Sequence, residues 1–255
     1  MRKIAVINQK GGSGKTTTVV NTSVNLARSG KKVLVVDLDP QAHTTIHLGL
    51  EPPSVTNSAY EVMVANLPLQ QAIVSTSQEG LSLLPSKIEL ASAEIELVTA
   101  VGREAVLRDA LKKMKGSFDY IIIDCPPSLG LLTLNALTAV TEVIIPIQAE
   151  FFALEGLTKL LQTIELVQKR INRDLKISGV VITMFDQRKN ICRDVAFRVK
   201  EHFKNKVYRT FIRENVRLAE APGFGKDIFS FAPLSHGAED YHRLTKEIIK
   251  QEGKI

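Results

Sequence analysis

Six short runs of isoleucine, valine and leucine recur along this chain, and they constrain its fold more than any other feature of the sequence. Polar residues hardly interrupt them, which is typical of strands that helices cover on both faces of a sheet. Stretches with helical apolar spacing lie between the runs, as parallel strands require. We expect strands at Ile4–Ile7, Lys32–Val36, Leu81–Leu84, Tyr120–Ile123, Glu142–Ile147 and Ile177–Thr183, and helices at Lys15–Arg28, Leu157–Ile171 and Ile191–Phe203.

The layout predicts one α/β domain over residues 1–255, with a mostly parallel, twisted central sheet and helices on both faces. No internal repeat or interdomain linker divides the chain. Apolar residues make up 44% of it and charged residues 24%, so it can bury a core and is not disordered. No apolar run approaches the roughly 18 residues of a membrane span. Two cysteines cannot form a disulfide framework, so we expect a cytoplasmic protein.

A glycine-rich loop with two lysines directly follows the first predicted strand. Small residues let consecutive backbone N–H groups turn toward phosphate oxygens, and the next helix points its positive end at the same place. Lys15 can then reach the terminal phosphates of a nucleotide, and the Thr16 hydroxyl can bind Mg²⁺. The usual pattern G-x-x-x-x-G-K-[ST] is not met, because Gln9 stands where its first glycine would be. The phosphate loop predicted for this P-loop NTPase fold is Lys10, Gly11, Gly12, Ser13, Gly14, Lys15, Thr16 and Thr17.

Three aspartates follow buried strands of the predicted sheet. Asp37 and Asp39 come after the strand that ends at Val36, and Asp124 follows the strand that ends at Ile123. Ligands of open α/β sheets bind at the carboxyl ends of the strands. An acid there, facing a phosphate loop, is what a magnesium site needs. The three segments together predict one nucleotide site.

These segments together resemble the ParA/MinD family of deviant Walker-A ATPases. The resemblance rests on the lysine-bearing loop, on Val36-Asp37-Leu38-Asp39-Pro40-Gln41 and on Ile123-Asp124-Cys125-Pro126-Pro127. Two further segments, residues 146–157 and 215–222, are similar to the chromosomal ParA (Soj) branch of the family. The similarity extends over nearly the whole chain.

The resemblance implies ATP and Mg²⁺ as cofactors, and a homodimer that holds both nucleotides at its interface. Lys10 matches the signature lysine that reaches across to the partner's phosphates. Lys15 matches the lysine that binds phosphate within its own subunit. A lysine supplied by the partner makes the complete site conditional on dimerisation, which couples nucleotide state to assembly.

The metal site that the resemblance implies consists of Thr16, Asp37, Asp39 and Asp124, and Asp39 would also position the attacking water. Asn215 belongs to a segment that lies near the nucleotide base in relatives. That segment departs from the family pattern, since Arg213-Glu214 stand where Pro-Arg is usual. Contacts to the base are therefore less firmly implied than contacts to the phosphates.

The positive charge of the chain is concentrated in one segment. Residues 185–217 hold ten lysines and arginines against four acids, which equals the whole net charge of +6. Such clustering predicts contacts to nucleic acid phosphates, and no base-reading motif is visible. By resemblance to Soj-like relatives, Arg188 and Arg217 would carry DNA contacts, with Lys189, Arg193, Arg198 and Lys200 as further candidates. Phe197 and Phe203 are predicted on the apolar face of their helix.

The resemblance also implies double-stranded DNA bound without sequence preference, a ParB-type partner that stimulates hydrolysis, and a location on the nucleoid. The predicted function is therefore DNA partitioning, as in chromosome or plasmid segregation. Positioning of another large cargo by the same biochemistry stays open.

Two other classes fit the sequence less well. A MinD-like ATPase that cycles on membranes would end in an amphipathic anchor, whereas Leu244, Ile248 and Ile249 predict a final helix packed on the domain. We therefore expect no stable membrane association. An electron-transfer ATPase resembling the nitrogenase iron protein would need two cluster cysteines in each subunit. Neither Cys125 nor Cys192 matches those positions.

Overall fold

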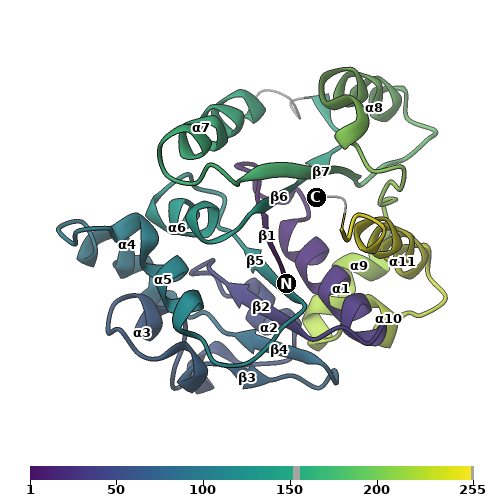
Figure 1. Cartoon of the computed structure of the whole chain (residues 1–255). Coiled ribbons are helices and arrows are strands. Elements are labelled where there is room, and N and C mark those ends of the chain that lie inside the picture. Colours follow the sequence, from purple (N-terminus) through teal and green to yellow (C-terminus); the bar gives the residue numbers. More distant parts are fainter. Residues whose placement is uncertain (152–155, 254–255) are drawn as a thin grey trace.

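The computed structural model describes residues 1–151 and 156–253 (Figure 1). Residues 152–155, which belong to one of the segments that carry the family resemblance, lie outside the described residues. The described part is built on a sheet with the strand order β3-β4-β2-β5-β1-β6-β7. All neighbouring strands are parallel except β3 and β4. The strands are β1 (Arg2–Val6), β2 (Val33–Asp37), β3 (Val74–Ser75), β4 (Leu81–Leu84), β5 (Tyr120–Asp124), β6 (Glu142–Gln148) and β7 (Lys176–Thr183).

The predicted α/β fold is confirmed, and helices cover both faces of the sheet. Alternate residues along each strand point to opposite faces, so Val35 and Val36 join different apolar clusters. One cluster includes side chains from α1 (Lys15–Arg28), α9 (Val216–Glu220), α10 (Ile228–Phe231) and α11 (His236–Ile249). Figure 1 shows these four helices together on one side of the sheet.

The second apolar cluster lies on the opposite face of the sheet. Its helices are α3 (Ala59–Met63), α4 (Ala93–Glu96), α5 (Val106–Lys113), α6 (Leu131–Ala139), α7 (Leu157–Arg170) and α8 (Asn190–Phe203). Cys125 and Cys192 are both buried in this cluster as free thiols. The short helix α2 (His43–His47) follows β2 and lies close to α1.

All six predicted strands and all three predicted helices are confirmed, with bounds that differ by at most two residues. The sequence did not reveal β3, because a strand of two residues is too short to form an apolar run. The segment between α2 and α3 contains a short 3₁₀ turn, η1 (Pro52–Ser54). Phe203 is buried as predicted, but Phe197 is 62% exposed, so its predicted place on the apolar face is wrong.

The C-terminal helix packs on the body of the protein, as predicted. Leu244 and Ile248 are buried against the face that α1 covers, and Ile249 is partly buried there. Ser235 caps the start of this helix by accepting a hydrogen bond from the Ala238 amide at 3.2 Å. None of the described helices is both long and apolar enough to span a bilayer.

Candidate functional site

The phosphate loop lies at the carboxyl edge of the sheet, between β1 and α1. Gly12 and Gly14 have φ values of 72° and 86°, a left-handed conformation that favours glycine. Helix α1 begins at Lys15, and its first hydrogen bond to the loop runs from the Thr18 amide to the Gly14 carbonyl at 2.9 Å. The amides of Lys15 to Thr17 precede that bond, and Gly14 has no side chain to cap them. The helix therefore presents open N–H donors to an anion.

Neighbouring strands hold the loop in this shape. The Thr183 hydroxyl, at the end of β7, donates a hydrogen bond to the Ser13 carbonyl at 2.9 Å. The Asn8 amide nitrogen donates to the Pro146 carbonyl at 2.6 Å, and its oxygen accepts from the Lys10 amide at 3.0 Å. The loop is thus fixed to β6 and β7 before a ligand arrives. Such preorganisation lowers the entropic cost of binding phosphate.

The two loop lysines have different environments. Lys15 is buried, and its ammonium group donates to the Lys10 carbonyl at 3.2 Å. Burial lowers the pKa of Lys15, although the nearby charges of Asp124 and Asp39 act in the opposite direction. Lys10 is more exposed, and its ammonium group lies 2.6 Å from a carboxylate oxygen of Glu150. Lys15 therefore points into the site, while Lys10 is held at its rim.

The carboxylates of Asp37 and Asp124 are adjacent because β2 and β5 pair in register at these residues. One oxygen of Asp124 accepts the Thr16 hydroxyl at 2.7 Å and the Thr44 hydroxyl at 2.8 Å. Its other oxygen is buried without a hydrogen-bond partner in the described residues. Burial raises the pKa of Asp124, and burial together with the charge of Asp124 raises the pKa of Asp37.

Asp37 and Asp39 are oriented by the segment between β2 and α2. Asp37 accepts hydrogen bonds from the Thr45 amide at 2.9 Å, the Thr45 hydroxyl at 2.7 Å and the Asp39 amide at 3.1 Å. Asp39 accepts the Gln41 amide at 3.0 Å. Ala42 closes this turn with φ of 54°, a left-handed conformation that is uncommon for alanine.

The site fits a magnesium ion that is completed by nucleotide phosphates. Mg²⁺ prefers oxygen ligands and usually takes only one or two from the protein. The Thr16 hydroxyl and the unpaired oxygen of Asp124 supply oxygens of this kind. The described residues contain no cluster of three histidine, cysteine, aspartate or glutamate side chains that could hold a metal alone. The buried Ser13 hydroxyl, also without a described partner, adds a polar group at the loop.

Comparison with known proteins agrees with this geometry. The model of an AAA domain family matches residues 1–177. The sporulation initiation inhibitor protein Soj of Bacillus subtilis is 52% identical over 96% of this chain and 97% of its own length. The chromosome partitioning protein ParA of Myxococcus xanthus is 45% identical over 98% of this chain and 89% of its own. The chain belongs to the ParA/MinD family, in its Soj-like branch.

A solved structure with a bound nucleotide analogue shares the fold of this ParA/MinD family member. Cobyrinic acid a,c-diamide synthase from Mycobacterium smegmatis, with a bound ATP analogue and magnesium, superposes with a TM-score of 0.87. It is 39% identical in sequence, and the match covers 98% of this chain and 95% of that one. That protein therefore binds the ligand class for which the loop geometry is suited.

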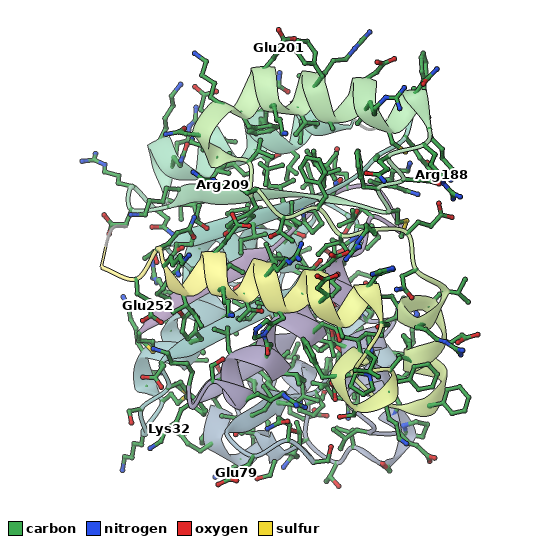
Figure 2. The ribbon with its side chains drawn as sticks, turned by 90° about the vertical axis from the view of Figure 1, so that its right-hand side faces the viewer. Lys32, Glu79, Arg188, Glu201, Arg209 and Glu252 are labelled. Atoms are coloured by element: carbon green, nitrogen blue, oxygen red, sulfur yellow. The ribbon has the colours of Figure 1, made fainter. Side chains whose placement is uncertain are left out.

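The predicted DNA-binding residues of this ParA/MinD family member fall into two groups. Arg188 and Lys189 line a groove of about 1070 Å³ together with Arg209, Arg213 and Arg243. Figure 2 looks onto this face, with Arg188 and Arg209 toward opposite ends of the space between α8 and α11. Of the other predicted residues, Arg193, Arg198 and Lys200 are exposed on α8, and Arg217 is exposed on α9.

Half of the six predicted DNA-binding residues are paired with acids. Arg188 pairs with the largely covered Asp186 side chain at 2.8 Å. Two pairs are exposed on both sides: Lys189 with Glu214 at 2.6 Å and Arg217 with Glu220 at 2.9 Å. Exposed pairs of this kind contribute little to stability, so their partners can be exchanged for phosphates. Lys200 lies over the Phe211 ring at 4.8 Å, a cation–π contact.

Asn215 lines the same groove and is not hydrogen-bonded to the described part of the phosphate loop. Its side chain caps α9 by accepting the Arg217 amide at 2.9 Å. The neighbouring Arg213 is bound to Asp240 at 2.6 Å and anchors this segment to α11. A contact between Asn215 and a nucleotide base stays a prediction.

Sequence reasoning missed the hydroxyl residues that orient the site. The Thr44 hydroxyl donates to Asp124, and the Thr45 hydroxyl donates to Asp37. The Thr183 hydroxyl donates to the loop carbonyl of Ser13. A signal existed for Thr183, because it ends a predicted strand at the carboxyl edge of the sheet. No comparable pattern marked Thr44 or Thr45, since α2 is only five residues long.

Proposed function

We propose that this protein is a magnesium-dependent ATPase that partitions DNA, switching between a DNA-binding ATP dimer and an ADP form that releases DNA. A ParB-type partner stimulates hydrolysis, and the ATP form is associated with the nucleoid. The observation that carries this proposal is the placement of Lys10, Lys15 and Asp39 around one preorganised phosphate loop. Close relatives named Soj and ParA support the partitioning role.

Within one subunit, the open amides of the loop and of α1 would hold the phosphate oxygens, with Lys15 at the terminal phosphate. Thr16 and Asp124 would hold Mg²⁺, supported by Asp37. When bound, Mg²⁺ neutralises charge that develops on the transferred phosphoryl group. Asp39 would orient the attacking water by accepting a hydrogen bond from it. The main contribution of the protein is position and charge, because phosphoryl transfer needs little covalent help.

Lys10 gives the proposed dimer its dependence on ATP. Its pair with Glu150 is exposed at the rim of the site, so the lysine can exchange that acid for a phosphate of a second subunit at small cost. The γ-phosphate then provides a contact that the ADP state lacks. A ligand shifts assembly only through such a difference in affinity between the two states.

The proposed chemistry is tested with Lys15→Ala and Asp39→Ala. Lys15→Ala removes the buried ammonium group at the phosphates, so ATP binding is lost in a titration with a fluorescent ATP analogue. Asp39→Ala leaves the phosphate ligands in place, so ATP-bound dimers persist in sedimentation velocity. Its turnover falls by about 100-fold or more, a usual loss for a group that handles the reacting proton.

Asp174→Ala is the matched control, because Asp174 is exposed and contacts none of the loop residues by hydrogen bond in the described structure. It should keep wild-type turnover and dimerisation. Hydrolysis by Asp39→Ala at the wild-type, partner-stimulated rate contradicts the role of Asp39.

A further inference from the structure

Three apolar side chains are exposed to solvent on α4 and on the turn that follows it. Ile95, Val98 and Val101 are 77%, 53% and 105% exposed. Helical-turn hydrogen bonds continue beyond α4, from the Val98 amide to the Ile95 carbonyl at 3.1 Å. This spacing places Ile95 and Val98 next to one another, and Val101 follows three residues later in the same exposed turn. We call these three side chains the α4 ridge. Single exposed apolar residues are common, but a cluster of them marks an interaction site.

The α4 ridge lies at the periphery of the molecule. Figure 1 shows α4 projecting beyond α5 and α6 on the side away from α11. Beneath it, Leu97 and Ala93 are buried in the apolar cluster of that face. The helix is therefore anchored by one side and free on the other, as a docking surface requires.

Acidic residues surround the α4 ridge. Residues 88–104 hold four glutamates and one basic residue, Arg103, although the whole chain has a net charge of +6. Glu89 and Glu96 are exposed. The guanidinium group of Arg103 donates to the Val98 carbonyl at the end of the ridge. The negative charge disfavours nucleic acid and anionic lipid surfaces and favours a basic partner.

The same helix touches the segment that leaves the metal site. Glu94 accepts a hydrogen bond from the Leu132 amide, at the start of α6, at 3.4 Å. The contact is close enough that a Cβ atom on Gly130 would come within 2.0 Å of the Glu94 carboxylate. Gly130 lies six residues after Asp124, at the end of the loop between β5 and α6. A partner bound on α4 would therefore lie one contact away from the loop that follows a proposed metal ligand.

We propose that the α4 ridge docks an amphipathic helical segment, with apolar residues on one face and lysines or arginines beside them, from the protein that stimulates hydrolysis. The stimulatory role rests on the proposed function, but the docking itself does not. The apolar residues of the segment cover Ile95, Val98 and Val101, and its basic residues pair with Glu89 and Glu96. Amphipathic helices are recognised through apolar contacts at this helical spacing, and flanking opposite charges fix their orientation.

Binding is measured by fluorescence anisotropy with a labelled synthetic peptide of 16 residues, with leucines on one helical face and lysines beside them. The affinity should fall at least ten-fold for Ile95→Ser/Val98→Ser and at least three-fold for Glu89→Lys. Leu234→Ser and Glu79→Lys are matched controls, because both residues are exposed outside the ridge. Both controls should bind like the wild type. Circular dichroism melts verify that all variants fold.

This assay needs no ATP, so its result does not depend on whether the proposed ATPase cycle is correct. Absence of peptide binding, or equal affinity for the wild type and Ile95→Ser/Val98→Ser, overturns the proposal. A ten-fold weaker ATP-dependent self-association of Ile95→Ser/Val98→Ser, with unchanged peptide affinity, also overturns it, because the ridge would then contact a second copy of this chain. Loss of peptide-stimulated ATP turnover in the same variant, with basal turnover retained, supports the link to α6.

Discussion

At the scale of single residues, the site depends on carboxylates whose burial costs folding free energy. Removing Asp37 and Asp124 from water disfavours their charged forms, and their proximity adds repulsion. Thr16, Thr44 and Thr45 offset part of this cost with hydroxyl donors. A divalent cation would neutralise the remaining charge, so the proposed magnesium ion would stabilise this cluster.

His47 gives the folded protein a predictable dependence on pH. Burial lowers the pKa of His47 to about 4, and the Lys226 backbone and the charge of Asp227 only partly counteract this effect. The unfolded chain therefore binds a proton that the folded chain excludes. The free energy of unfolding is fully retained above pH 6.5 and decreases as pH falls toward 4, by about 3 kcal/mol.

His47→Leu removes that dependence, which chemical denaturation at pH 7 and pH 4.5 can measure. His43→Leu is the matched control, because His43 lies on the same helix but is exposed. The His43 variant should lose stability between the two pH values as the wild type does. An unchanged pH dependence in His47→Leu contradicts this assignment.

At the scale of secondary structure, the sequence predicted the elements well and their side-chain partners poorly. Buried parallel strands are nearly uninterrupted apolar runs, so β1, β2 and β4 to β7 could be found from composition and spacing alone. The carboxyl ends of those strands then indicated the site. Ion pairs depend on which acid the tertiary fold brings near each base, and no local pattern encodes that choice.

The pairing of Arg188 with Asp186 changes what the basic segment should do. The hydrogen bonds from Arg188 lower the pKa of Asp186 to about 2, so the pair stays charged throughout the physiological range. Phosphate must compete with Asp186 for the guanidinium group. We expect Asp186→Asn to bind duplex DNA about three-fold more tightly with ATP, because a free guanidinium forms charge-assisted bonds to phosphate. Equal or weaker binding in an electrophoretic shift assay contradicts this expectation.

Charge reversal at Arg188 and Arg217 tests the basic surface by removing its positive charge. The double variant Arg188→Glu/Arg217→Glu should bind duplex DNA at least ten-fold more weakly with ATP. For every phosphate that the variant no longer neutralises, the salt slope should also become less negative by about 0.9. Arg170→Glu, an exposed arginine at the end of α7, is the matched control and should leave both values unchanged. Wild-type affinity in the double variant rules out this surface as the DNA-binding site.

At the scale of the whole molecule, the phosphate loop and the basic groove meet along one edge of the sheet. Thr183 ends β7 while holding the Ser13 carbonyl, and Phe185, two residues later, lines the groove. A dimer built on the loop would therefore carry two basic grooves in fixed positions. Two such surfaces on one duplex bind by avidity, which makes DNA affinity depend on nucleotide-driven assembly.

The most direct test measures duplex DNA binding with ATP, with ADP and without nucleotide, for the wild type and for Lys15→Ala at one salt concentration. The account predicts binding at least ten-fold tighter with ATP than with ADP for the wild type. It predicts no difference among the three conditions for Lys15→Ala. Equal wild-type affinity in ATP and ADP, or ATP-dependent binding by Lys15→Ala, would contradict a nucleotide-switched DNA-binding protein.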